Sequence, residues 1–109
     1  MKGNARIART MLGYEDHGIL SCWLSLEQPG SSQGFGGYRL DAPKDADSSM
    51  GTFWVSRILQ VVGVSNWEAL VGQHIRVDGE EYGDIFGIGH ITEDKWFYPK
   101  KEIAERFGK

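Results

Sequence analysis

Residues 19–27 read Ile-Leu-Ser-Cys-Trp-Leu-Ser-Leu-Glu, and this stretch carries the clearest secondary-structure signal in the chain. Successive side chains of a strand point to opposite faces of a sheet, so strict alternation predicts a strand with one buried face. Trp23 falls on the other face, between two serines. The apolar residues that share the expected buried face are Leu20, Cys22, Leu24 and Leu26.

The segments on either side of this strand also have extended character. Residues 5–12 predict a strand, and the glycines and acidic residues of 13–18 predict a hairpin connection to residue 19. Residues 28–34 contain Pro-Gly and two serines, which predict a flexible loop, and an extended pattern resumes over residues 35–40. Residues 41–51 are polar and predict a second mobile loop.

The spacing of apolar residues becomes helical after residue 52. Thr52 is the expected N-cap of a helix over residues 53–62, and Gly63 suits the position just after a helix. A short second helix is expected to start at the capping box Ser65-x-x-Glu68. Beyond it, the sequence predicts extended segments over 74–77, 82–91 and 96–98, a turn at Asp78-Gly79, and a final helix that begins at Pro99.

These elements predict an α+β fold. We expect a small, mainly antiparallel, curved β-sheet packed against one central helix, with a short second helix and a C-terminal helix. The 109 residues suit a single domain. Glycine occurs 15 times, about twice its usual share, which fits curved and closely packed strands.

Composition argues against several classes of protein. No apolar run reaches the roughly 20 residues of a membrane helix, and the first residues lack the apolar region of a secretory signal. The lone Cys22 cannot form an internal disulfide, which favours a reducing, cytoplasmic setting. A net charge of −3 argues against a broad phosphate-binding surface, so nucleic acid is not an expected partner.

The sequence has no arrangement typical of catalysis or of metal binding. The three histidines have no ligand partner at helical spacing, and the chain has no Cys-x-x-Cys. Cys22 lies on the buried face of a predicted strand, where a thiol is inert. The glycine-rich residues 34–37 and 83–89 lack the strand–loop–helix context of a phosphate-binding loop. We therefore expect a protein that is not an enzyme and has no cofactor and no metal site.

Binding is the remaining chemistry. Residues 33–41 (QGFGGYRLD) combine bare glycine backbone with two aromatic rings and a guanidinium group, which suits a planar or anionic partner and equally suits a bulged edge strand. Residues 96–98 are three consecutive aromatics, which cannot all face one side of a strand. The expected partner- or ligand-binding residues are Phe35, Tyr38, Arg39, His90 and Trp96.

Several segments together resemble a family of small proteins of bacteriophages and prophages. The segments are residues 12–19 (LGYEDHGI), 33–41 (QGFGGYRLD), 62–72 (VGVSNWEALVG), 87–90 (GIGH) and 94–97 (DKWF). The similarity spans nearly the whole chain, and it implies a phage accessory protein in the cytoplasm of a bacterial host. It supplies no catalytic residues. The loop at residues 42–51 is shorter than the family pattern leads us to expect.

The leading hypothesis for function is a non-enzymatic protein that binds and blocks a host protein or complex, above all a bacterial defence component, as anti-CRISPR proteins do. One alternative is a sponge that sequesters a small nucleotide signal, in a pocket lined by Arg39. Another is a nucleic-acid-binding regulator, although its candidate cations lie in different elements. A homodimer is compatible with each hypothesis. The candidate cations are Arg6, Arg9, Arg39, Arg57 and Arg76.

Overall fold

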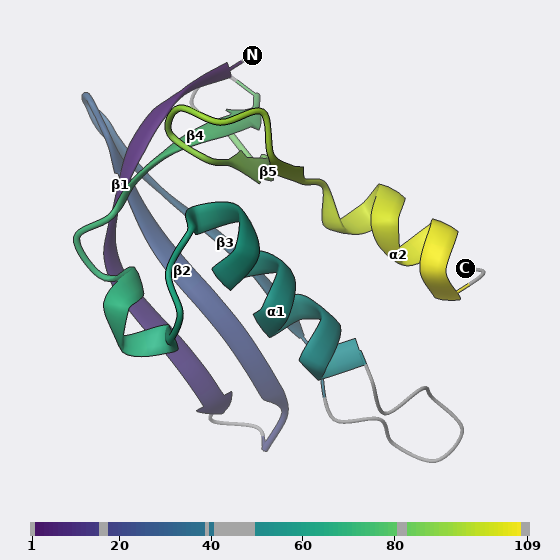
Figure 1. Ribbon diagram of the computed structural model, residues 1–109. Coiled ribbons are helices and arrows are strands. Elements are labelled where there is room, and N and C mark those ends of the chain that lie inside the picture. Colours follow the sequence, from purple (N-terminus) through teal and green to yellow (C-terminus); the bar gives the residue numbers. More distant parts are fainter. Residues whose placement is uncertain (1, 16–17, 39, 41–49, 81–82, 108–109) are drawn as a thin grey trace.

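The computed structural model describes residues 2–15, 18–38, 40, 50–80 and 83–107. Its strands form one antiparallel sheet in the order β3-β2-β1-β4-β5-β6, with α1 lying across one face (Figure 1). The fold is therefore α+β, with a curved antiparallel sheet packed against a central helix, as the sequence predicts. The elements are β1 (Lys2–Tyr14), β2 (Leu20–Gln28), β3 (Ser31–Tyr38), α1 (Met50–Val62), the 3₁₀ turn η1 (Trp67–Leu70), β4 (His74–Gly79), β5 (Ile85–Gly89), β6 (Trp96–Phe97) and α2 (Pro99–Phe107).

The long strand β1 is the one on which the sheet curves. Its N-terminal part, from Lys2 to Arg6, pairs with β4, whereas the part from Arg6 to Tyr14 pairs with β2. The register with β2 shifts between Ile7 and Arg9, and such bulges increase the bend and twist of a strand. The curvature brings β3 into contact with β5, although three strands separate them in the sheet order.

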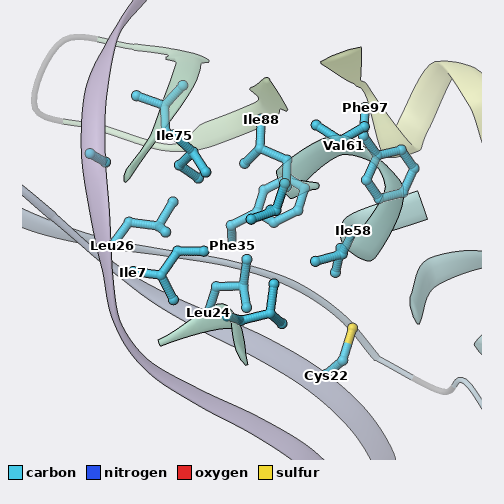
Figure 2. Packing of buried hydrophobic residues seen from close by; sticks show 14 of the residues in the cluster. Ile7, Cys22, Leu24, Leu26, Phe35, Ile58, Val61, Ile75, Ile88 and Phe97 are labelled. Carbon is cyan, nitrogen blue, oxygen red and sulfur yellow. The ribbon is translucent and has the colours of Figure 1, made fainter. Parts of the chain in front are cut away.

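The buried face of the sheet is the one that the alternation in β2 predicts. Cys22, Leu24 and Leu26 have no exposed surface, and they pack in one cluster with Ile58 and Val61 of α1 (Figure 2). Burying a large apolar side chain stabilises a fold by about 1.5–3 kcal/mol. This cluster therefore holds α1 on the sheet.

An aromatic group at the centre of the core joins the two ends of the sheet. The ring of Phe97 in β6 lies 6.1 Å from that of Phe35 in β3 and 5.2 Å from that of Trp54 in α1, centroid to centroid. All three side chains are buried. The first and last strands of the sheet are thus held together by side-chain packing rather than by strand pairing.

The connection between β2 and β3 is shorter than the sequence predicts. A loop is expected over residues 28–34, but Pro29 and Gly30 alone form the turn, and β3 begins at Ser31. Gly30 has a φ of 78°, a conformation that favours glycine at the third position of such a turn. Continuous pairing with β2 outweighs the loop-forming composition of Ser31 and Ser32. Of the second expected loop, residues 41–49 lie outside the described residues, while Met50 and Gly51 already belong to α1.

The helix starts also differ from expectation. Because α1 begins at Met50, Thr52 lies in the first turn rather than at the N-cap. The helix expected from Ser65-x-x-Glu68 is a single 3₁₀ turn whose N-cap is Asn66, with a side chain that accepts a hydrogen bond of 2.9 Å from the Ala69 N–H. Two other expectations are confirmed, since Gly63 follows α1 with a φ of 90° and α2 begins at Pro99.

The pairing of β4 with β5 contradicts the turn expected at Asp78-Gly79. Both residues belong to β4, and a bulge there keeps Gly79 opposite Ile85. The extended segment expected over residues 82–91 is accordingly limited to β5. In the described part of the chain, no helix combines the length and apolar character needed to cross a membrane.

Candidate functional site

An indole ring lies over the glycines of β3, on the face of the sheet opposite to the core. Trp23 of β2 is directly across from Gly36, and its neighbours Cys22 and Leu24 point into the core. A Cβ atom added to Gly34 would lie 2.8 Å from Nε1 of this ring, and one added to Gly36 would lie 2.7 Å from its Cε3. Real Cβ atoms do not approach so closely, so glycine at both positions gives the ring its place.

The glycines of β5 form a second support of the same kind. A Cβ atom added to Gly87 would lie 2.6 Å from Cδ1 of Tyr98, and one added to Gly89 would lie 2.7 Å from Cδ2 of Trp96. The two rings above these glycines stack, with centroids 5.8 Å apart and planes 19° apart. Two Gly-x-Gly segments, one near each end of the sheet order, thus place aromatic rings on its outer face.

A hydrogen bond fixes the tyrosine of this pair. The hydroxyl of Tyr98 donates to Oδ2 of Asp78 at 2.8 Å. Burial, followed by this hydrogen bond to a carboxylate, raises the pKa of Tyr98 to about 12. Burial acts to raise the pKa of Asp78 as well, but the hydrogen bond from Tyr98 and the nearby charge of Lys2 outweigh it and hold that pKa below its ordinary value.

Two cations border the other ring. The guanidinium carbon of Arg76 lies 4.8 Å from the ring centroid of Trp96, and Nζ of Lys2 lies 5.2 Å from it. Arg76 is held in place because it donates hydrogen bonds of 2.7 and 2.6 Å to the carbonyls of His90 and Glu93. These contacts with carbonyl oxygens leave its positive charge on the surface beside the rings.

Phe86 links the two sets of rings. The bulge between β4 and β5 leaves Phe86 without a residue opposite it, while Ile85 turns toward the core. The ring of Phe86 is 6.5 Å from that of Tyr98, and 50% of the residue is exposed. We call Trp23, Phe86, Trp96 and Tyr98 together the outer aromatic surface.

A groove of about 360 Å³ lies where the curled sheet fails to close. One side is the backbone of β3 from Gly34 to Gly36, and the opposite side is formed by residues 84–86 together with Pro99 and Lys100. Trp23 and Trp54 also line it. We call this the seam groove, and two members of the outer aromatic surface, Trp23 and Phe86, border it.

Phe35 is not a surface residue, which corrects the expectation that its side chain binds a partner. It is 3% exposed, because it pairs with Leu24 and shares the inward face of the sheet with that residue. Its ring packs against Trp54 and Phe97 in the core. A partner in the seam groove would meet its backbone and only the margin of its ring.

The other expected binding residues are dispersed. Tyr38 ends β3, where its backbone pairs with Ser21, but its side chain and the whole of Arg39 lie outside the described residues. His90 is half-buried, and its Nδ1 accepts hydrogen bonds from the N–H groups of Thr92 at 3.1 Å and Glu93 at 2.9 Å. His90 therefore caps the turn after β5. Trp96 alone among the five expected residues is placed on the outer aromatic surface.

Trp23, Phe86 and Tyr98 were not among the expected binding residues. The sequence does contain a signal for Trp23, since glycines two apart on a paired strand leave room for a large ring opposite. Exposure of Phe86 depends on the bulge at Gly79, which the sequence does not reveal. Within the residues that the structure describes, no cluster of three or more His, Cys, Asp or Glu side chains could hold a metal ion.

Comparison of the chain with protein-family models, with curated proteins and with solved structures gives no match. The function of this surface is therefore argued from its own residues.

Proposed function

We propose that this chain is a non-enzymatic phage accessory protein that binds and blocks a host protein or complex, above all a bacterial defence component, as anti-CRISPR proteins do. The observation that carries the proposal is the outer aromatic surface beside the seam groove. Trp and Tyr side chains are frequent anchors of protein interfaces, and Phe86 is half-exposed. The phage context comes from the resemblance of the sequence segments to phage proteins.

The support beneath the rings favours protein binding. Trp96 and Tyr98 lie over glycine backbone, and the hydrogen bond to Asp78 restrains Tyr98 further. Side chains that are already ordered lose little conformational entropy when a partner covers them. Lys2 and Arg76 at the margin of the rings give the apolar centre and charged rim that protein interfaces typically have.

Binding of nucleic acid is less well supported. Of the arginines that such a function would use, Arg6 is paired with Glu27 at 2.8 Å and Arg57 with Glu102 at 2.8 Å. Arg57 also donates to the carbonyl of Trp96, and Arg76 donates to two carbonyls. Phosphates would have to compete with these contacts, and a net charge of −3 leaves little gain from counterion release.

The nucleotide sponge also has little specific support. Lys100 is the cation in the described lining of the seam groove. Phosphate groups are usually held by several N–H donors or by paired Arg and Lys side chains. A small nucleotide is therefore kept as an outcome of the experiment below.

The experiment is capture from a lysate of bacterial host cells, with mass spectrometry of the proteins and small molecules retained. Three forms of the chain are compared: wild type, Phe86→Ala, and Val71→Ala. Val71 is 48% exposed and follows η1, away from the rings, so it is a matched apolar control. Truncating an interface anchor costs about 2 kcal/mol or more, which corresponds to roughly 30-fold weaker binding.

We expect wild type and Val71→Ala to retain the same host protein and Phe86→Ala to lose it. Purified complexes should then give a dissociation constant that changes only for Phe86→Ala. Retention of a nucleotide, or of nucleic acid, in place of a protein would favour the corresponding alternative. A host protein that all three forms retain equally would mean that this surface is not the binding site.

A further inference from the structure

The backbone of β3 faces the seam groove with unused hydrogen-bonding groups. β2 and β3 are joined by a two-residue turn and keep one register from Gln28↔Ser31 to Ser21↔Tyr38. In such a hairpin the residues next to the turn exchange both backbone hydrogen bonds, and every second pair after them does so too. The intervening residues direct their N–H and C=O groups to the other edge; in β3 these are Ser32, Gly34 and Gly36.

This edge has none of the usual features that prevent strand addition. Proteins protect edge strands with charged residues, with proline or with bulges. Residues 31–37 contain no charge and no proline, and the register with β2 has no shift. Among the described residues, β2 is the one strand that pairs with β3. Because Gly34 and Gly36 have no side chains, another backbone can approach them closely.

The opposite wall of the groove limits what can occupy the edge. Residues 84–86, Pro99 and Lys100 face the edge across the groove, so the edge is recessed rather than open to a flat surface. In a second copy of the chain, the same wall would stand beside its own β3, and the two recessed edges could not meet. A single extended segment from another protein meets no such obstacle.

From this geometry we propose that the seam groove binds an extended peptide segment of a partner protein, which adds to the sheet as a strand along Ser32, Gly34 and Gly36. The inference rests on the proposed function and identifies how the partner is held. Alternate side chains of the segment face the apolar rings of Trp23 and Phe86 at the mouth of the groove, and Lys100 selects an acidic residue. About five residues of partner backbone span the three edge positions.

The test uses a library of random twelve-residue peptides displayed on filamentous phage and selected against the folded wild-type chain. Selected peptides are synthesised and titrated by fluorescence anisotropy against wild type, Ser32→Pro and Ser32→Ala. Proline at position 32 removes one N–H from the free edge and none from the pairing with β2, whereas alanine keeps that N–H. Hydrogen exchange of the Gly34 and Gly36 amides is measured by NMR in the wild-type chain with and without peptide.

We expect peptides with alternating apolar residues and an acidic residue. Their binding should weaken at least ten-fold in Ser32→Pro and less than two-fold in Ser32→Ala, and exchange of both glycine amides should slow in the wild type. Absence of any enriched peptide, or unchanged exchange at Gly34 and Gly36 in the complex, would overturn the proposal. The exchange measurement decides the matter even if Ser32→Pro fails to fold.

The two proposals can fail separately. If a host protein is captured through Phe86 and yet leaves exchange at Gly34 and Gly36 unchanged, the strand addition is wrong and the proposed function stands. If peptides add to β3 but no host protein is captured, the proposed function is wrong and the edge site stands.

Discussion

The hydroxyl of Tyr98 and the carboxylate of Asp78 meet at 2.8 Å, and this hydrogen bond ties the residue before α2 to β4. The same contact holds the ring over Gly87, on the outer face of the sheet. It therefore contributes both to stability and to the shape of the outer aromatic surface.

Tyr98→Phe should change the response of the chain to alkali. The pKa of Tyr98 is raised from 10.0 to about 12 in the folded chain, so its contribution is complete below pH 10 and is lost as the pH rises toward 12. Wild type should lose free energy of unfolding over this range more steeply than Tyr98→Phe. Urea unfolding at a series of pH values measures the difference, and parallel profiles would contradict it.

Replacement of Gly36 should be costly although its φ is not positive. An added Cβ would collide with the carbonyl oxygen of Cys22 and with Trp23, so Gly36→Ala must displace the backbone of β2. We expect a loss of about 2 kcal/mol or more in the free energy of unfolding. Gly3→Ala is the matched control, because its Cβ would meet Gln28 at an ordinary 3.8 Å. That control should be neutral or slightly stabilising.

His90→Ala should weaken the turn that leads into β6. Nδ1 of His90 accepts the N–H groups of Thr92 and Glu93, and removal of the ring leaves both without this acceptor. We expect a loss of about 1–2 kcal/mol in the free energy of unfolding. His74→Ala removes an exposed imidazole from β4 and should change it by less than about 0.5 kcal/mol. Equal effects of the two changes in thermal or urea unfolding would contradict the capping role.

Cys22 should resist modification in the folded chain. Burial raises the pKa of its thiol from 9.0 to about 11, and the side chain has no exposed surface. The thiolate fraction at pH 8 alone falls about 100-fold relative to an ordinary thiol. Labelling by an aromatic disulfide reagent should therefore be at least that much slower in native buffer than in 6 M guanidinium. Rapid labelling of native protein would show that β2 opens readily.

The sequence predicts those parts of the fold in which a local pattern and the tertiary environment agree. Alternation at Leu24 and Leu26 identifies the buried face of β2, and Gly63 and Pro99 mark the limits of helices. The polar residues Ser31 and Ser32 predict a loop, yet pairing with β2 makes them part of a strand. Long-range pairing of this kind leaves no trace in local composition.

The binding surface is harder to predict for a related reason. Phe35 and Trp96 are both aromatic residues in glycine-rich strands, but Phe35 is opposite Leu24 and faces the core. The register that decides between burial and exposure depends on the turn at Pro29-Gly30. Phe86 is exposed because of a bulge in the neighbouring strand, which is a property of two strands rather than of one.

The division of β1 between two partners has a consequence for the order of folding. β1, β2 and β3 are neighbours along the chain, so their hairpins close short loops. Gly3, in contrast, pairs with Val77, and this contact must bring together residues from distant parts of the sequence. Closing a long loop costs more entropy and slows folding, so the three-strand meander should form first and the β4–β6 half should dock later. The pairing of residues 2–6 thus governs the rate at which the molecule acquires its seam, and a chain caught before that step would present both halves of its core to solvent.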